Sequence, residues 1–308
     1  MNGSRDKSGR KGGFVLVSIL LVMTLLIAGA TGYAWFARNQ LEFISREKFD
    51  VKARGISYAA VLQIAKGLQY DDNAYDSFLE PWFGTQLIPV PELGILKIDI
   101  IPMDGKIPIN ELFLPDGETL RREMTYSWDE IWDIYEDSRL GTVLLDFLDR
   151  NTRPRLGGEE RDYFPNRDLA DISEIRLLES IPEEIFASTP LTPALGDLIT
   201  VSGSGKINLN IASFAVLRLI DGVNETAALE IIEERQKEPF KSIEEVQRRV
   251  PSLDEGAIPR IMNLLGFKSS YFRINVEVRS VPDQDFKYYS AVLHKDGARC
   301  TIAKWEEN

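Results

Sequence analysis

The sequence predicts an α+β protein in which a long N-terminal membrane-spanning helix packs on a small antiparallel sheet that carries a large all-α insertion. Three observations predict this class. A long apolar run without charges follows a short basic segment near the N-terminus. Runs with the two-residue period of strands occur early and at the end of the remaining chain, and the stretch between them has helical periodicity.

The uncharged run 14–37 would form a helix about 36 Å long, enough to cross a hydrocarbon core of about 30 Å. Four basic residues precede it: Arg5, Lys7, Arg10 and Lys11. By the positive-inside rule they place the N-terminus in the cytoplasm and the chain after Arg38 outside. A cleavable secretory signal has small residues after a shorter apolar core, whereas Gly12 and Gly13 come before this one. The run is therefore predicted to remain as an anchor.

This order of basic leader, glycine, phenylalanine and long apolar helix resembles the signal of type IV prepilins and type II secretion pseudopilins. The resemblance implies that a membrane peptidase cuts after Gly13 and methylates the new amino terminus at Phe14. Most pilins carry a glutamate at the fifth mature position, where this sequence has Ser18. Without that carboxylate a subunit lacks the attachment to a neighbour's terminal amine, which suits a special position in a filament. An ordinary single-pass anchor is the alternative.

Composition excludes several classes of function. The formal net charge of −12 argues against nucleic acid or anionic lipid as the main partner of the part outside the membrane. The single cysteine, Cys300, forms no intrachain disulfide, and the single histidine, His294, has no second histidine or cysteine to share a zinc ion. Since nucleophile, base and orienting group cannot be assembled from these residues, the chain is predicted not to be an enzyme.

The elements follow in order. Helical spacing of apolar residues continues from the anchor to about Gly67, amphipathic in its second half. Alternation predicts one or two strands within 87–101, with a turn at Asp104-Gly105, and three strands within 271–305, with a hairpin turn at Asp296-Gly297. The predicted organisation is a leader at 1–13, an anchor or filament-core helix at 14–37, an amphipathic helix and first strands at 38–110, helical subdomains at 111–203 and 204–270, and C-terminal strands at 271–308.

The two helical subdomains begin with similar motifs. Asp-Gly-Lys-Ile-Pro-Ile-Asn at 104–110 is echoed by Ser-Gly-Lys-Ile-Asn-Leu-Asn at 204–210, and Asn110 and Asn210 are each predicted to cap a following helix. Capping boxes are predicted at Ser127 with Glu130 and at Ser242 with Glu245. Ser202–Lys206 hints at a phosphate loop but departs from the motif on both sides, so a turn is predicted there.

The second subdomain looks like the paired helix-hairpin-helix, or SAM-like, arrangement of some DNA-uptake proteins. It predicts four short helices within 205–268. Hairpins of this kind that bind DNA have the sequence Gly-apolar-Gly, because without side chains the backbone N–H groups can approach a phosphate. Here the two hairpins read Gly-Val-Asn at 222–224 and Ser-Leu-Asp at 252–254. Residues 205–268 contain nine basic and ten acidic residues, so they do not form the basic surface that binds nucleic acid by releasing counterions from its phosphates. The subdomain is therefore predicted to be a protein-contacting scaffold.

Together these features resemble the protein K family of type II secretion minor pseudopilins. The supporting segment reads LLDFLDRN at 144–151 and GGEERDY at 157–163, with Phe147 and Asn151 replacing the tryptophan and second aspartate typical of the family. The resemblance implies a non-enzymatic subunit at the pseudopilus tip that helps to start assembly for export of folded proteins. It implies as partners the minor pseudopilins I and J, the major pseudopilin, the assembly platform and the prepilin peptidase.

The same resemblance implies a single-pass protein of the inner membrane of a Gram-negative-type bacterium, with its C-terminal domain in the periplasm. A minor pilin of a type IV pilus and a membrane-anchored DNA receptor are the alternatives.

Five oxygen-bearing side chains gather around the glycine-rich part of this segment: Asp149, Asn151, Glu159, Glu160 and Asp162. Such ligands suit a hard cation, and calcium sites are known in the resembling family. An EF-hand is excluded because its sixth position, counted from Asp149, is Pro154 instead of glycine. A calcium site and a solvated acidic loop are the two interpretations, and no other cofactor is predicted.

Overall fold

The computed structural model describes residues 9–281 and 285–307. Residues 1–8 of the predicted leader lie outside this part. The chain divides into two compact units, one up to Ile56 and one from Ser57 onward.

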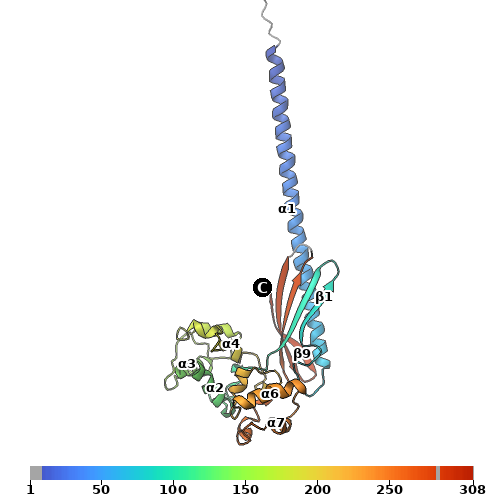
Figure 1. The fold of residues 1–308 in the computed structure, drawn as a ribbon. Coiled ribbons are helices and arrows are strands. Elements are labelled where there is room, and N and C mark those ends of the chain that lie inside the picture. Colours follow the sequence, from blue (N-terminus) through green and yellow to red (C-terminus); the bar gives the residue numbers. More distant parts are fainter. Residues whose placement is uncertain (1–8, 282–284, 308) are drawn as a thin grey trace, which may run out of the picture. The chain divides into compact units, whose positions relative to one another are not determined.

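The first unit is the larger part of helix α1 (Gly9–Tyr70), which is unbroken through the predicted anchor and ends three residues after the predicted Gly67 (Figure 1). Its apolar side chains are exposed, Phe14 by 75%. By length and composition the helix is long and apolar enough to cross a membrane. The predicted long N-terminal helix is therefore confirmed.

The second unit contains an antiparallel sheet in the order β1-β2-β7-β8-β9. The strands are β1 (Gly84–Val90), β2 (Gly94–Pro102), β7 (Tyr271–Arg279), β8 (Phe286–Asp296) and β9 (Arg299–Glu307). Along β2, buried Leu96 and Ile98 alternate with partly exposed Lys97 and Asp99, so one face of the sheet is apolar. The part of α1 within this unit lies against the sheet, and Tyr58 contacts Trp305 with ring centroids 5.4 Å apart.

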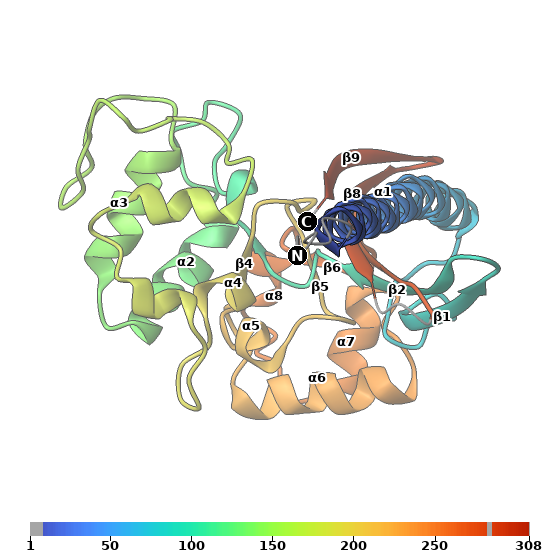
Figure 2. The ribbon, with the colours of Figure 1, turned by 90° about the horizontal axis from the view of Figure 1, so that it is seen from above.

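Between β2 and β7 lies the predicted helical insertion. Its α-helices are α2 (Arg122–Ile134), α3 (Ser138–Leu148), α4 (Leu195–Leu198), α5 (Phe214–Arg218), α6 (Glu225–Lys237), α7 (Ile243–Arg249) and α8 (Ile258–Ile261). Three 3-10 helices, η1 (Ile109–Glu111), η2 (Ile172–Leu177) and η3 (Glu183–Phe186), complete the helical part that the structure describes. A single apolar cluster, including Trp132, Phe147 and Phe240, runs through both subdomains. Figure 2 shows α2 and α3 grouped apart from α6 and α7.

The echoed motifs begin matching structures. In the first, β3 (Ile107–Pro108) pairs in parallel with β4 (Ile199–Thr200), and in the second, β5 (Ile207–Asn208) pairs in parallel with β6 (Leu265–Gly266). Each subdomain thus opens on a two-residue strand that follows the lysine of the motif, and it ends with a second short strand paired in parallel with the first. The similarity that the sequence indicated is therefore a repeat of architecture.

The prediction that the two asparagines cap helices was wrong. Pro108 stands at the N-cap of η1 and Ser213 at that of α5. The Asn110 amide exchanges hydrogen bonds with the backbone of Leu169, N to Oδ1 and Nδ2 to O, both at 2.9 Å. Asn210 does the same with Phe240 at 2.8 and 2.9 Å. An amide side chain carries both a donor and an acceptor, so it can pair with a distant peptide group as well as cap a helix.

The two predicted capping boxes differ in outcome. The prediction at Ser127 was wrong, because α2 begins at Arg122 and Ser127 lies buried inside it. The prediction of a helix start at Ser242 is confirmed, since its hydroxyl accepts from the Glu245 amide at 3.4 Å. Glu245 reaches back to the amide of Lys241, one residue before the position expected for a capping box.

Candidate functional site

The predicted processing site lies on α1. The helix runs without interruption across the Gly13–Phe14 bond. Ser18 donates its hydroxyl proton to the Phe14 carbonyl at 2.9 Å, so the side chain is satisfied within its own helix. Ser18 therefore presents no charge where a pilin glutamate would stand. Cleavage after Gly13 and methylation of Phe14 stay predictions.

The acidic segment 146–162 is organised by a residue that the sequence analysis missed, Asp146. Its buried carboxylate accepts the Arg155 backbone N–H with both oxygens at 3.1 Å. The Arg155 side chain turns back over the same place, with Nη2 at 2.7 Å from Asp149 Oδ2 and Nε at 3.5 Å from Asp146 Oδ1. Two buried carboxylates thus share one guanidinium. The sequence signal was present, since Asp146 stands three residues before Asp149 on the last turn of α3.

The five predicted calcium ligands do not all converge. Asp149 is buried and Asn151 bonds inside the loop, accepting from Arg153 N at 2.7 Å. Glu159 faces Arg161 at 3.3 Å, and Asp162 is exposed. Across residues 9–281 and 285–307 no group of three or more His, Cys, Asp or Glu side chains has the geometry to hold a metal ion. Calcium binding remains a prediction, and Asp149 and Glu160 are the two members that carry it best.

Asp149 and Glu160 each have a raised pKa and a buried carboxylate oxygen that forms no hydrogen bond within the described residues. Burial raises the pKa of Asp149 to about 6, opposed by the charge of Arg155. Burial and the charges of Asp149 and Asp146 raise the pKa of Glu160. Asp149 Oδ2 and Glu160 Oε1 are buried without a hydrogen bond within the described structure, and the Arg155 contact to Asp149 lacks hydrogen-bond geometry. The interpretation as a solvated acidic loop requires these oxygens to lie in water. It therefore applies only to the exposed part of the segment.

The helix-hairpin-helix turn at 221–224 is closed by contacts within the chain. Gly222 has φ +80°, and its carbonyl accepts from Asp254 N at 3.1 Å. A Cβ at this glycine would lie 2.3 Å from that of Ala257, so the turn packs directly on the second hairpin. Asp221 pairs with Arg260 at 2.6 Å. A carboxylate on each hairpin disfavours phosphate at the place where related motifs bind it.

The glycine-rich turn Ser202–Lys206 also holds a carboxylate. Asp104, fully buried, accepts from Ser204 N at 2.7 Å and from Ser270 N and Tyr271 N at 2.8 and 2.9 Å. Burial raises the pKa of Asp104, and these hydrogen bonds oppose the rise. Because Asp104 already accepts from the Ser204 N–H, a carboxylate lies where a phosphate would have to bind, which favours the interpretation as a turn.

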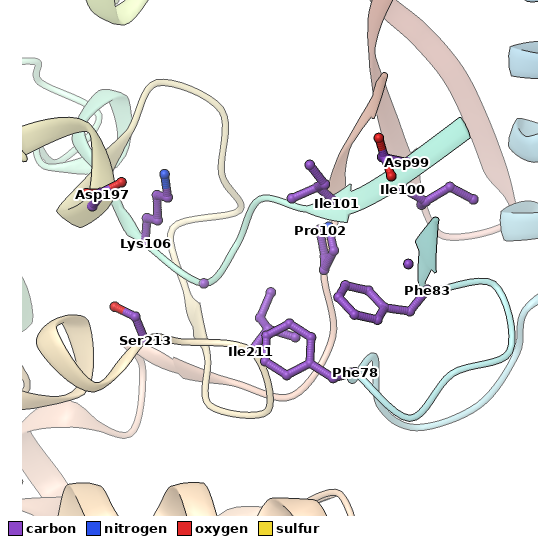
Figure 3. A pocket seen from close by; sticks show the side chains of 12 residues that line it. Phe78, Phe83, Asp99, Ile100, Ile101, Pro102, Lys106, Asp197, Ile211 and Ser213 are labelled. Atoms are coloured by element: carbon purple, nitrogen blue, oxygen red, sulfur yellow. The ribbon is translucent and has the colours of Figure 1, made fainter. Parts of the chain in front are cut away.

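A cavity of about 410 Å³ opens where the end of β2 meets both helical subdomains. Figure 3 shows Phe78, Phe83, Pro102 and Ile211 gathered on one side of it. Lys106, Asp197 and Ser213 line the other side. Asp99 also lines the cavity, beside Ile100 and Ile101, so one wall is mostly apolar with a single carboxylate and the other is charged.

A second cavity of about 270 Å³ shares Ile101, Pro102 and Lys106 with the first. Lys106 donates to the Gly196 carbonyl at 2.5 Å. Burial lowers the pKa of Lys106, and the charge of Asp197 opposes this. In the sequence, only its place in the echoed motif distinguishes Lys106 from other lysines.

This chain is similar to known proteins in one motif and in its fold. The helix-hairpin-helix motif family matches residues 202–265. A search of curated proteins found no match to the sequence. The solved structures include a similar chain in the crystal structure of the GspK-GspI-GspJ complex from enterotoxigenic Escherichia coli Type 2 Secretion System, at a TM-score of 0.60 and 16% identity. The alignment covers 88% of this chain and 99% of that one.

The chain has the GspK fold. This confirms the predicted fold class, namely a long N-terminal apolar helix, an antiparallel sheet and a helical insertion with a helix-hairpin-helix motif. At 16% identity the likeness concerns the fold alone.

Proposed function

We propose that this chain is a minor pseudopilin of a type II secretion system, located at the pseudopilus tip, where it helps to initiate assembly. The observation that carries the proposal is the GspK fold over 88% of the chain, joined to an N-terminal helix with the length and composition of a membrane span. In this role the helix holds the protein in the inner membrane until it enters the filament core. The chain acts as a structural subunit and not as an enzyme.

Two features support the tip position. Ser18 bonds to its own helix and offers no carboxylate to the terminal amine of a neighbouring subunit. An unpaired carboxylate within the bilayer is costly, so pilins that keep one use it for a contact. The second feature is size, because residues 57–308 form one compact unit that would obstruct stacking of another subunit above it.

The same comparison supports the first of the proposed partners. The matching structure is a complex of GspK with GspI and GspJ, and we propose that this chain binds the corresponding minor pseudopilins of its own system. The major pseudopilin, the assembly platform and the prepilin peptidase complete the proposed partners. The unit from Ser57 onward would then lie in the periplasm and serve the export of folded proteins across the outer membrane.

The first experiment measures the mass and amino-terminal sequence of the protein isolated from membranes, with and without Gly13→Ala. A mature form that starts at methylated Phe14, lost in the variant, supports prepilin-type processing. A chain that keeps its leader in both cases contradicts the proposal. Co-purification with the cognate minor pseudopilins I and J then separates a pseudopilus subunit from a minor pilin of a type IV pilus.

A DNA receptor is the second candidate, favoured specifically by the helix-hairpin-helix match at 202–265. Against it, both hairpins carry carboxylates and the Asp221 carboxylate already pairs with Arg260. Fluorescence anisotropy with a labelled duplex tests it. An affinity that falls steeply with salt would favour the receptor, since phosphate contacts release counterions. We expect no such binding.

A further inference from the structure

We propose that the two joined cavities around Lys106 form a docking groove for an extended segment of a partner protein in which a carboxylate side chain stands next to a large apolar one. The apolar side chain would enter the larger cavity, and the carboxylate would lie between Lys106 and Arg273. This binding does not depend on membership of a pseudopilus.

The apolar wall is preformed. The rings of Phe78 and Phe83 have centroids 4.8 Å apart, and the Arg235 guanidinium lies over Phe78 at 5.5 Å. Arg235 is itself fixed, donating to the carbonyls of Leu209 and Ala212 at 2.7 Å. Phe78 is nevertheless 45% exposed. An aromatic ring that is fixed and open to solvent offers apolar area at little entropic cost.

The charged side chains that line the smaller cavity indicate which side chain the partner carries next to its apolar one. In the smaller cavity Asp171 already pairs with Lys304 at 2.9 Å. Lys106 and Arg273, by contrast, form no ion pair within residues 9–281 and 285–307, although both line this cavity. Both side chains line the smaller cavity, and the charge of Arg273 acts on Lys106. A carboxylate from a partner would neutralise both.

The place of that carboxylate follows from Asp197. Asp197 faces Lys106 from α4, near enough to interact with its charge. It repels an incoming anion, so the ligand carboxylate is directed to the Arg273 side of Lys106. Ile101 and Pro102 line both cavities, and Ile101 is 43% exposed. In an extended peptide that crosses Ile101, neighbouring side chains point to opposite faces, one towards each cavity.

The test uses the full chain in detergent micelles, labelled at isoleucine methyl groups and titrated with N-acetyl-Phe-Glu-amide. We expect saturable shifts at Ile101 and Ile211, and at least fivefold weaker binding of N-acetyl-Phe-Gln-amide, which has the same shape without the charge. Lys106→Met and the exposed Arg273→Met should each remove that preference for glutamate. Lys206→Met is the matched control, because Lys206 holds the same position in the echoed motif but is exposed and lines neither cavity.

Three results would overturn the proposal: no saturable shift up to the solubility limit of the probe, equal affinity for the two probes, or shifts confined to isoleucines outside the groove. Arg273→Met keeps the test decisive if Lys106→Met loses its folded spectrum, because Arg273 lies on the exposed face of β7. The processing and co-purification experiments on the proposed function have separate readouts, so either proposal can fail alone.

Discussion

The side-chain amide of Asn210 and the backbone of Phe240 exchange two hydrogen bonds, Nδ2 to O at 2.9 Å and N to Oδ1 at 2.8 Å. Both residues are buried, Asn210 at 1% and Phe240 at 0% exposure. The pair fixes the loop between α6 and α7 against the turn that opens the second subdomain. Asn110 and Leu169 form the same arrangement in the first subdomain.

Replacing Asn210 by alanine is expected to lower the free energy of unfolding by about 3 kcal/mol. The change leaves the N–H and carbonyl of Phe240 without partners in a buried place, and each such group costs about 1–3 kcal/mol. Urea unfolding in mild detergent measures the effect. Gln236→Ala, an exposed change on α6, is the control and should stay within about 0.5 kcal/mol of the parent. Equal stability of the two variants would contradict the role given to the amide.

These asparagines also mark what the sequence could and could not predict. Apolar periodicity identified the anchor, the helical insertion and the three C-terminal strands, since each depends on side chains within a few residues of one another. The partner of Asn210 lies 30 residues away and that of Asn110 lies 59 away. Capping a helix satisfies the hydrogen-bonding groups of an asparagine with neighbours in the sequence. A partner that is distant in the sequence is revealed only by the packed structure.

The same limit applies to the acidic segment and the groove. Asp149 was recognised because it stands in a row of oxygen-bearing residues, whereas Asp146, on the apolar helix α3, was not. Arg155 was not selected as the cation that Asp146 and Asp149 share, because the loop that folds it back has no sequence signature. Lys106, in the loop after β2, comes near Arg273 of β7 because β2 pairs with β7, and spacing along the sequence gives no sign of this.

Gly158 is expected to be required for the acidic loop. A Cβ at this position would lie 1.9 Å from Asp146 Oδ2, inside any allowed contact. Gly158→Ala must therefore displace the carboxylate that holds Arg155, with an expected loss of about 1–3 kcal/mol. Gly196→Ala is the control, because its Cβ would meet only Ile172 at 3.8 Å. Thermal unfolding compares them, and an unshifted midpoint for Gly158→Ala would show that the loop adjusts freely.

Calcium, if it binds here, is expected to act through Asp149. At a free concentration 100 times the Kd, a single site raises the free energy of unfolding by about 2.7 kcal/mol. Asp149→Asn should abolish this increment, while Asp162→Asn, which changes an exposed residue, should leave it intact. Differential scanning calorimetry at pH 7 with calcium, magnesium or chelator measures it. No increment for the parent chain favours the loop as a purely internal ion-pair network.

The contact between Asp171 and Lys304 predicts an acid-sensitive link between the first subdomain and the sheet. Burial raises the pKa of Asp171, but hydrogen bonds from Ser173 and Lys304 outweigh it and hold the pKa at about 2. A depressed carboxyl pKa contributes stability above its unfolded value near 3.9, and this is lost as the pH falls towards 2. With 42% of the Asp171 side chain exposed, solvent screening limits the contribution to about 1 kcal/mol.

A carboxyl-carbon NMR titration reads this pKa directly. Lys304→Met should raise the pKa of Asp171 towards the ordinary value of about 3.9, and Lys206→Met, at an exposed lysine elsewhere, should not. Lys304→Met should also lower the free energy of unfolding at pH 6 but not near pH 2. An Asp171 pKa near 4 in the parent chain would mean that the pair does not form in solution.

Ser18→Glu tests the chemical basis of the proposed tip position. The serine hydroxyl bonds to Phe14 O within α1, so the variant exchanges a satisfied neutral group for a carboxylate in the apolar segment. Insertion of a lone charge costs about 2.5–3.5 kcal/mol, which a nearby terminal amine can offset. We expect the variant to enter the filament below its normal position, next to a processed subunit, and to reduce secretion. Ser18→Ala is the control, since it removes the hydroxyl without adding charge. If Ser18→Glu assembled at the same position and supported full secretion, the missing carboxylate would not explain the proposed tip position, and the proposal would have to depend on the large unit from Ser57 onward alone.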